Sequence, residues 1–236
     1  MLVAYSRGLK NRKGDFPYLD RYFCNRTGND IYSGQFTETD RIVICDGVSR
    51  SPENPEQLVG YATRMLVKYM SGRFFGLLGK RHTASRLAKA IEDVNDDVFE
   101  KLKMAMIPFA ATTALTCYYD GRNLCYAWAG NSRLYKISEN GIEQLTQDHV
   151  KEDGKSLLKA IGGPPIKADK GFVKVNEGDI FIACTDGLFE NLDNGSISEI
   201  VIEKEIKTAV DALMEEAAGK GTIDDITVVG FCKKIS

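Results

Sequence analysis

Residues 113–129, TALTCYYDGRNLCYAWA, carry the clearest signal of the fold. Two runs rich in apolar, aromatic and β-branched residues, Thr113 to Tyr119 and Leu124 to Ala129, predict buried strands. The dipeptide Asp120-Gly121 lies between them and is typical of a tight hairpin turn. The stretch therefore predicts two neighbouring antiparallel strands.

Similar short runs lie on both sides of this hairpin, together with helical patterns. The other predicted strands are Arg41–Cys45, Leu134–Ile137, Ile180–Cys184 and Ile226–Cys232. Apolar residues at three- and four-residue intervals predict helices over Pro55–Met70, Thr83–Leu102 and Ile206–Ala218, with a shorter helix around Ser196–Glu199. Antiparallel strands and a helical pair indicate the α+β class, with helices packed on sheets. No repeat or linker interrupts the 236 residues, so one domain over residues 1–236 is expected.

The composition is that of an ordinary soluble globular protein. The chain has 31 basic and 33 acidic residues, a net charge of -2 that gives no reason to expect nucleic acid or membrane as a partner. No apolar run approaches the roughly 18 residues that span a bilayer, and Met1 to Tyr5 is too short an apolar run for a signal peptide. A cytoplasmic protein is the expectation.

The six cysteines and two histidines argue against several kinds of site. No two cysteines form a CxxC pair, and most lie in apolar runs, so reduced, buried cysteines are expected. His82 and His149 are far apart, which argues against zinc and against a Ser-His-Asp nucleophile. The sequence also lacks the CxxxxxR loop of cysteine-based phosphatases.

Carboxylates stand at the ends of several predicted strands. Asp46-Gly47 follows one strand, Asp186-Gly187 follows another, Asp224-Asp225 precedes a third, and Asp30 lies upstream. Each of these segments, taken alone, is typical of a solvated turn. Four carboxylates that converge would repel one another unless cations held them together, and oxygen ligands select hard cations such as Mg²⁺, Mn²⁺ or Ca²⁺.

The order and spacing of these residues resemble the metal-dependent protein phosphatases of type 2C, the PPM family, in their bacterial form. The resemblance runs over nearly the whole chain. The matching motifs, in order, are Asn29-Asp30, Asp46-Gly47-Val48, Ala111-Thr112-Thr113-Ala114 (GTT in the family), Gly130-Asn131-Ser132-Arg133 (GDSR), Leu145 to His149 (LTxDH), Gly178-Asp179 through Thr185 to Leu188 (GD…SDGL), and Asp224 to Thr227 (DNIT).

This resemblance implies a four-layer α-β-β-α sandwich, two antiparallel sheets flanked by helices, with the metal ions at one end between the sheets. It implies that Asp46 bridges two Mg²⁺ or Mn²⁺ ions and that the Gly47 carbonyl binds one of them. It assigns the other ion to Asp186 and Asp224, with Asp30 as a direct or water-mediated ligand. The implied reaction is hydrolysis of phosphoserine or phosphothreonine on proteins: a water shared by the metals attacks phosphorus, and no covalent enzyme intermediate forms.

Several positions depart from the family pattern and leave alternatives open. The family's phosphate-binding arginine is expected at Arg26, one place late, with Arg12 as the alternative. Asp15 is the alternative to Asp30 as the aspartate of the first motif. Asn29 stands where many relatives carry glutamate, so metal binding is expected to survive but to be weaker.

Two further departures bear on activity. Asn131 replaces the aspartate that helps bind a third metal in bacterial relatives, which favours two ions. His149 is followed within a few residues by Ser156 to Gly162, so the mobile flap of relatives is nearly absent and broader substrate acceptance is expected. His149 itself is expected to be structural.

Three functions remain open from the sequence. The first is an active phosphatase acting, as a monomer, on phosphorylated substrates of a serine/threonine kinase. The second is a binding or regulatory module with the same fold and little turnover, a pseudophosphatase, which Asn131, Ser49 and the displaced arginine favour. The third is a hydrolase of other phosphoesters on this fold. The retained Asp46, Asp186 and Asp224 favour an enzyme, because a decayed site has no physical reason to keep mutually repelling carboxylates.

Overall fold

The computed structural model describes residues 2–9, 21–23, 35–48, 55–71, 79–107, 109–154, 156–202, 204–222 and 224–233. Strands and helices alternate along the chain in a mixed order. The elements are β1 (Leu2–Leu9), β2 (Arg21–Phe23), β3 (Gln35–Thr39), β4 (Arg41–Cys45), α1 (Pro55–Met70), α2 (Lys80–Met104), β5 (Ala114–Tyr119), β6 (Asn123–Ala129), β7 (Arg133–Ser138), β8 (Gly141–Gln144), β9 (Asp169–Lys174), β10 (Ile180–Cys184), α3 (Asp186–Phe189), α4 (Asn194–Val201), α5 (Ile206–Gly219) and β11 (Ile226–Lys233).

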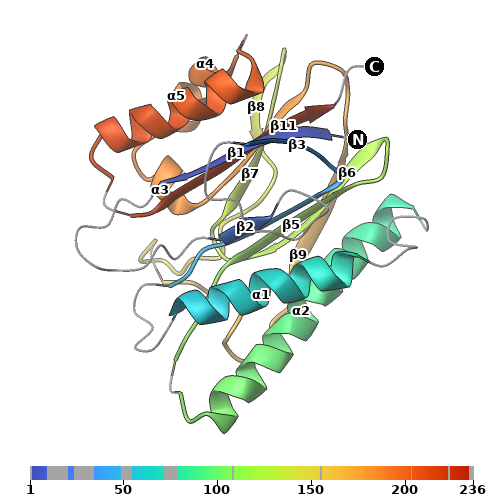
Figure 1. Cartoon of the computed structure of the whole chain (residues 1–236), viewed down its shortest axis with the longest axis vertical. Helices are drawn as coiled ribbons and strands as arrows, with labels where there is room; N and C mark the ends of the chain where they lie inside the picture. The colour runs from blue at the N-terminus through green and yellow to red at the C-terminus, as the bar shows by residue number, and fades with distance from the viewer. Residues whose placement is uncertain are drawn as a thin grey trace.

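The described strands form two antiparallel sheets that pack face to face. One sheet has six strands in the order β3-β1-β11-β10-β7-β8, and the other has five in the order β2-β4-β5-β6-β9. Figure 1 shows α1 and α2 on the outer face of the five-stranded sheet, and α4 and α5 on the outer face of the other. The predicted α+β class and four-layer sandwich are confirmed.

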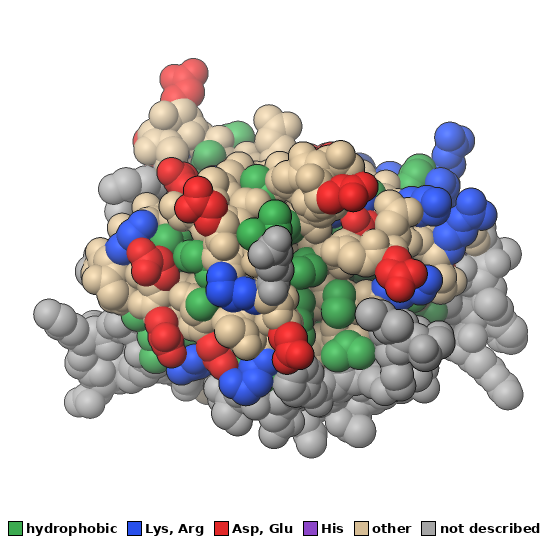
Figure 2. All heavy atoms as spheres, turned by 90° about the horizontal axis from the view of Figure 1, so that it is seen from above, with side chains coloured by type: hydrophobic (Ala, Val, Ile, Leu, Met, Phe, Trp, Pro, Cys, Tyr) green, Lys and Arg blue, Asp and Glu red, His purple; other side chains and the backbone are tan. Residues whose placement is uncertain are grey.

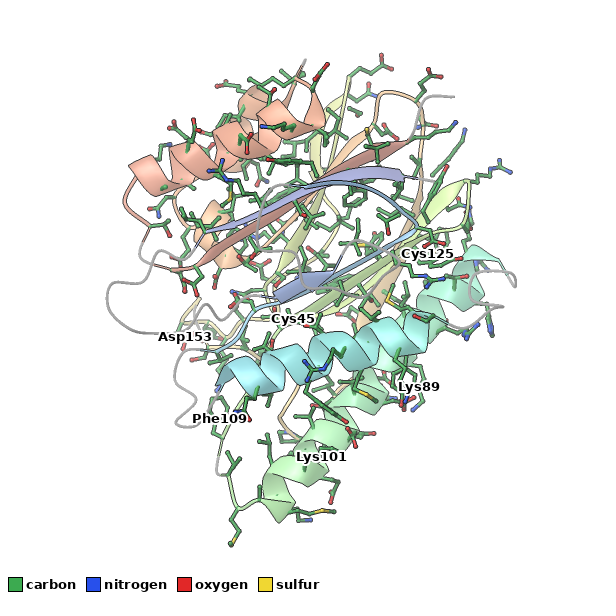
Figure 3. The ribbon with its side chains drawn as sticks, in the orientation of Figure 1. Cys45, Lys89, Lys101, Phe109, Cys125 and Asp153 are labelled. Atoms are coloured by element: carbon green, nitrogen blue, oxygen red, sulfur yellow. The ribbon has the colours of Figure 1, made fainter. Side chains whose placement is uncertain are left out.

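Three layers of apolar side chains hold the sandwich together. Strand β4 contributes side chains to two of these layers, because successive residues point to opposite faces of the sheet. Ile42 and Ile44 point between the sheets, whereas Val43 and Cys45 point toward α1 and α2. Figure 3 shows Cys45 close to α1. A third apolar layer joins α3, α4 and α5 to the six-stranded sheet. Sheets with both faces covered explain why these strands read as nearly continuous apolar runs.

The helices fit the same pattern. The stripe of α2 that packs on the five-stranded sheet includes Leu87, Ile91, Val94 and Val98, at the predicted spacing, and all four are buried. None of the described helices is long and apolar enough to cross a membrane. The outer face over α4 and α5 carries side chains of both charge signs among apolar ones (Figure 2).

One end of the sandwich collects the chain segments that carry the candidate residues. The strand registers place the end of β4, the end of β10, the start of β7 and the start of β11 at this end. The chain also crosses here from one sheet to the other, because β6 ends at Ala129 and β7 begins at Arg133. The opposite end carries the β5–β6 turn near Cys125 (Figure 3).

Candidate active site

Asp46 follows β4 directly, and two threonines fix its backbone. The Thr113 amide donates to the Asp46 carbonyl oxygen at 2.8 Å, and the Thr112 hydroxyl donates to the same oxygen at 2.9 Å. The Asp46 amide in turn donates to the Thr113 hydroxyl at 3.0 Å. Gly47 forms a β-bridge with Thr112. The two residues before β5 therefore fix the backbone of the buried Asp46 at the edge of the sheet.

Asp186 follows β10 as the first residue of α3, beside the turn that precedes β11. Thr185 and Thr227 join the two strands here: the Thr185 amide donates to the Thr227 carbonyl at 3.1 Å, and the Thr227 amide donates to the Thr185 hydroxyl at 3.0 Å. A Cβ on Gly187 would lie 2.1 Å from the Asp225 carbonyl oxygen, so only glycine permits this approach. The close approach brings Asp224 and Asp225 against Asp186.

The structure brings the three predicted aspartates together. The Asp46 carboxylate lies within hydrogen-bonding reach of the Asp186 carboxyl, a contact between two acceptors that requires a shared proton or a cation. Burial raises the pKa of Asp186, and the charge of Asp224 raises it further. Asn131 donates from Nδ2 to Asp186 Oδ2 at 3.0 Å. Asp186 Oδ1 is buried and has no hydrogen-bond partner among the described residues.

A buried, unpartnered carboxylate oxygen among other carboxylates fits a hard divalent cation, which prefers oxygen ligands. Within the described ranges, no group of three or more His, Cys, Asp or Glu side chains is placed to hold a metal ion by itself. The predicted ligand Asp30, the predicted phosphate ligand Arg26 and their alternatives Asp15 and Arg12 lie outside the described residues. The described aspartates alone do not make a complete ligand set, and the metal site stays a prediction.

The three residues that cross between the sheets line the same end. Gly130 has a φ of +113°, and a Cβ there would lie 2.6 Å from Thr113 Cγ2, so glycine is required on both counts. The Ser132 and Thr113 hydroxyl oxygens lie 2.7 Å apart. The crossover is therefore tied to the threonine that holds Asp46. The hydrogen bond from Asn131 to Asp186 was not predicted from the sequence. There Asn131 was interpreted only as the loss of the family's aspartate and its charge.

Arg133 is held by other contacts at the start of β7. Its guanidinium donates to both carboxylate oxygens of Asp148, with the shortest contact at 2.7 Å, and to the Tyr135 hydroxyl at 3.0 Å. It also lies 3.6 Å from the ring centroid of Phe189. Such a bidentate, stacked arginine is fixed by its neighbours. Arg133 therefore joins β7 to the segment after β8 and to α3 rather than replacing the predicted phosphate arginine.

His149 joins the crossover to β9. The Gly130 amide donates to His149 Nδ1 at 3.2 Å, so the neutral ring carries its proton on Nε2, which lies 2.6 Å from Asp169 Oδ2. The ring also stacks on Trp128, with centroids 5.8 Å apart. These contacts match the structural role expected from the sequence.

The environment of His149 predicts a pH-dependent stability. Burial lowers the pKa of the imidazole, against the opposing effect of its hydrogen bond to Asp169. A histidine with a lower pKa in the folded state stabilises the fold when neutral, and this contribution is lost as the pH falls below the unfolded value of about 6.5. Urea unfolding of wild-type protein and His149→Gln between about pH 7 and about pH 5 should show the steeper loss of stability in the wild type.

The matched control is His82→Gln, because His82 is exposed on α2. That variant should keep the wild-type pH dependence. An identical pH dependence in wild-type protein and His149→Gln would contradict the assignment of a neutral, buried ring.

Known proteins match this chain along most of its length. The family model described as Stage II sporulation protein E (SpoIIE) matches residues 60–233. The serine/threonine phosphatase stp of Listeria innocua is 24% identical over 231 residues, covering 86% of this chain and 90% of the relative.

Solved structures of similar chains share the fold. A bacterial serine phosphatase superposes with a TM-score of 0.82 at 19% identity, over 98% of this chain and 99% of the other. The catalytic domain of the serine/threonine phosphatase PstP, in complex with two manganese ions, superposes with a TM-score of 0.75 at 19% identity, over 98% of this chain and 99% of the other. At these identities the superpositions establish the architecture.

Proposed function

Because this chain belongs to the SpoIIE family of PP2C-like proteins, we propose that it is a metal-dependent phosphatase that hydrolyses phosphoserine or phosphothreonine on proteins. The observation that supports this most directly is the meeting of Asp46, Asp186 and Asp224 at one end between the sheets. The names of the relatives, serine/threonine phosphatases, agree with it.

The proposed site residues have two roles: some bind the cations, and others position these ligands. Asp46, Gly47, Asp186 and Asp224 are the proposed ligands of two Mg²⁺ or Mn²⁺ ions, with Asp30 completing the set. When bound, the cations supply Lewis acidity, which lowers the pKa of water and offsets negative charge on a phosphoryl group.

The rest of the described site positions these ligands. Thr112 and Thr113 fix the Asp46 backbone, and Asn131 holds one oxygen of Asp186. Such preorganisation lowers the cost of arranging the carboxylates during each turnover. Arg26 remains the predicted ligand of the substrate phosphate.

The names of the relatives favour an enzyme over a binding module without turnover. The buried carboxylate oxygen without a partner supports a cation in either case, because such a group otherwise lowers stability. The phosphorylated protein substrates, a partner serine/threonine kinase, the monomeric state, the cytoplasmic location and the absence of nucleic-acid or membrane partners stay predictions. So do the single domain with its nearly absent flap and the broad substrate acceptance that follows from it.

The test is release of phosphate from a phosphothreonine peptide with Mn²⁺, with Mg²⁺, and with excess EDTA. We expect turnover with either metal and its loss in EDTA, with recovery when Mn²⁺ is added back, because the proposed chemistry needs the cations. Turnover unchanged by EDTA would contradict the mechanism. A folded protein that binds Mn²⁺ but hydrolyses no phosphoester would favour the binding module.

A further inference from the structure

The backbone around Asn131 is fixed by contacts other than the one to Asp186. It lies half-buried in the crossover between β6 and β7, and both of its chain neighbours are anchored. The Gly130 amide donates to His149 Nδ1 at 3.2 Å, and the Ser132 hydroxyl lies 2.7 Å from the Thr113 hydroxyl. The asparagine amide is thus presented to Asp186 from a rigid support, which makes the direction of its hydrogen bond reproducible.

The amide makes the two oxygens of Asp186 different from each other. Oδ2 accepts the hydrogen bond from Asn131 Nδ2 at 3.0 Å, while Oδ1 is buried without a partner among the described residues. The bond resists rotation of the carboxyl group about its Cβ–Cγ axis, because a partial turn moves the accepting oxygen away from Asn131. The contact therefore fixes the plane of the carboxyl group, with one oxygen on Asn131 and the other available to a cation.

The neutral charge of Asn131 matters as much as its hydrogen bond. An aspartate in this position has no proton to donate when ionised, so it would set two carboxylates against each other at the distance of a hydrogen bond. Asp186 already has the carboxylates of Asp46 and Asp224 as neighbours. A further negative charge would raise the repulsion in the metal-free protein.

We propose that Asn131 is a positioning residue: it orients Asp186 for a divalent cation and spares the metal-free fold a further carboxylate. The inference rests on the proposed function for the identity of the cation, but it concerns metal affinity and stability rather than turnover. It assigns to this departure from the GDSR pattern a role of its own in addition to the loss of a charge.

Two variants test the two halves of the inference, with Mn²⁺ as the probe. Asn131→Ala removes the donor and should weaken Mn²⁺ binding in calorimetry roughly tenfold, the usual effect of losing a hydrogen bond to a metal ligand. Asn131→Asp adds the charge and should lower the melting temperature in EDTA by several degrees, with a larger increase on adding Mn²⁺ than the wild type shows.

Asn140 provides the matched control, because it is an exposed asparagine in the β7–β8 turn. Asn140→Asp adds the same charge away from the site and should change neither Mn²⁺ affinity nor the melting temperature in EDTA. Mn²⁺ affinity within twofold of wild type in Asn131→Ala would overturn the orienting role. A melting temperature in EDTA equal to wild type in Asn131→Asp would overturn the charge argument.

These measurements separate this inference from the proposed function. If the wild type binds Mn²⁺ and hydrolyses phosphopeptide while both Asn131 variants behave like wild type, only the inference fails. If the variants respond as expected while the wild type hydrolyses no phosphoester, only the proposed function fails. A wild type that takes up no Mn²⁺ would overturn both.

Discussion

Asp186→Ala should lower phosphate release from a phosphothreonine peptide roughly a thousandfold, equivalent to about 4 kcal/mol of transition-state stabilisation. The reason is that Asp186 lies beside the two other candidate aspartates, Asp46 and Asp224, and is held by Asn131. Steady-state assays with saturating Mn²⁺ measure this effect.

The same substitution should leave the metal-free protein at least as stable as wild type. Burial and neighbouring charge already disfavour the ionised Asp186, as the direction of its pKa shift indicates, so its removal relieves repulsion. Melting in EDTA therefore distinguishes a lost ligand from a lost fold.

Asp193→Ala gives the opposite pattern and serves as the control. Asp193 caps α4 by accepting a hydrogen bond from the Ser196 amide at 2.8 Å, so its loss should cost about 1 kcal/mol of stability without affecting turnover. Wild-type turnover in Asp186→Ala would remove Asp186 from the mechanism.

Gly187→Ala should lower the free energy of unfolding by about 3 kcal/mol and also reduce turnover. The added methyl group would lie 2.1 Å from the Asp225 carbonyl oxygen, and because the obstacle is backbone, the turn before β11 must move. That movement separates Asp224 from Asp186. Urea unfolding followed by circular dichroism measures the first effect, and the peptide assay measures the second.

Gly195→Ala is the matched substitution in a neighbouring helix. A Cβ on Gly195 makes only an ordinary contact, 3.5 Å from Asp193 Oδ1, so alanine should be neutral or stabilising by up to about 1 kcal/mol. Equal stability in the two variants would show that the contact between α3 and the Asp225 turn is not tight.

Local patterns predicted the parts of the fold that depend on local sequence. Strands β4 and β10 and helix α1 match their predicted bounds, because apolar runs and helical spacing are properties of a short segment. The buried face of α1 was predicted less well. The apolar spacing that predicts this helix includes Tyr69, which is 41% exposed, and omits Val59 and Met70, which are fully buried.

Strands that depend on distant partners were missed. The run at Leu2 was considered only as a leader segment, yet it forms β1 because β3 and β11 pair with it on both sides. Asp169 to Lys174 has too many polar residues to predict a strand, and it becomes β9 by pairing with β6.

The candidate site also combines residues that local sequence predicts with contacts that depend on distant segments. Asp46, Asp186 and Asp224 stood out because each adjoins a strand end, and strand ends are visible in the sequence. The hydrogen bond from Asn131 and the closeness of Gly187 to Asp225 depend on which strands lie side by side. No single segment carries that information.

The pairing of β1 with β11 has a consequence for synthesis of the protein. Every strand of the five-stranded sheet is available once the chain has reached Lys174, so that sheet and α1 and α2 can assemble early. The other sheet lacks the strand between β1 and β10 until β11 leaves the ribosome. Until then the face of the five-stranded sheet that packs on the other sheet is not fully covered. The nascent chain should therefore need protection from aggregation.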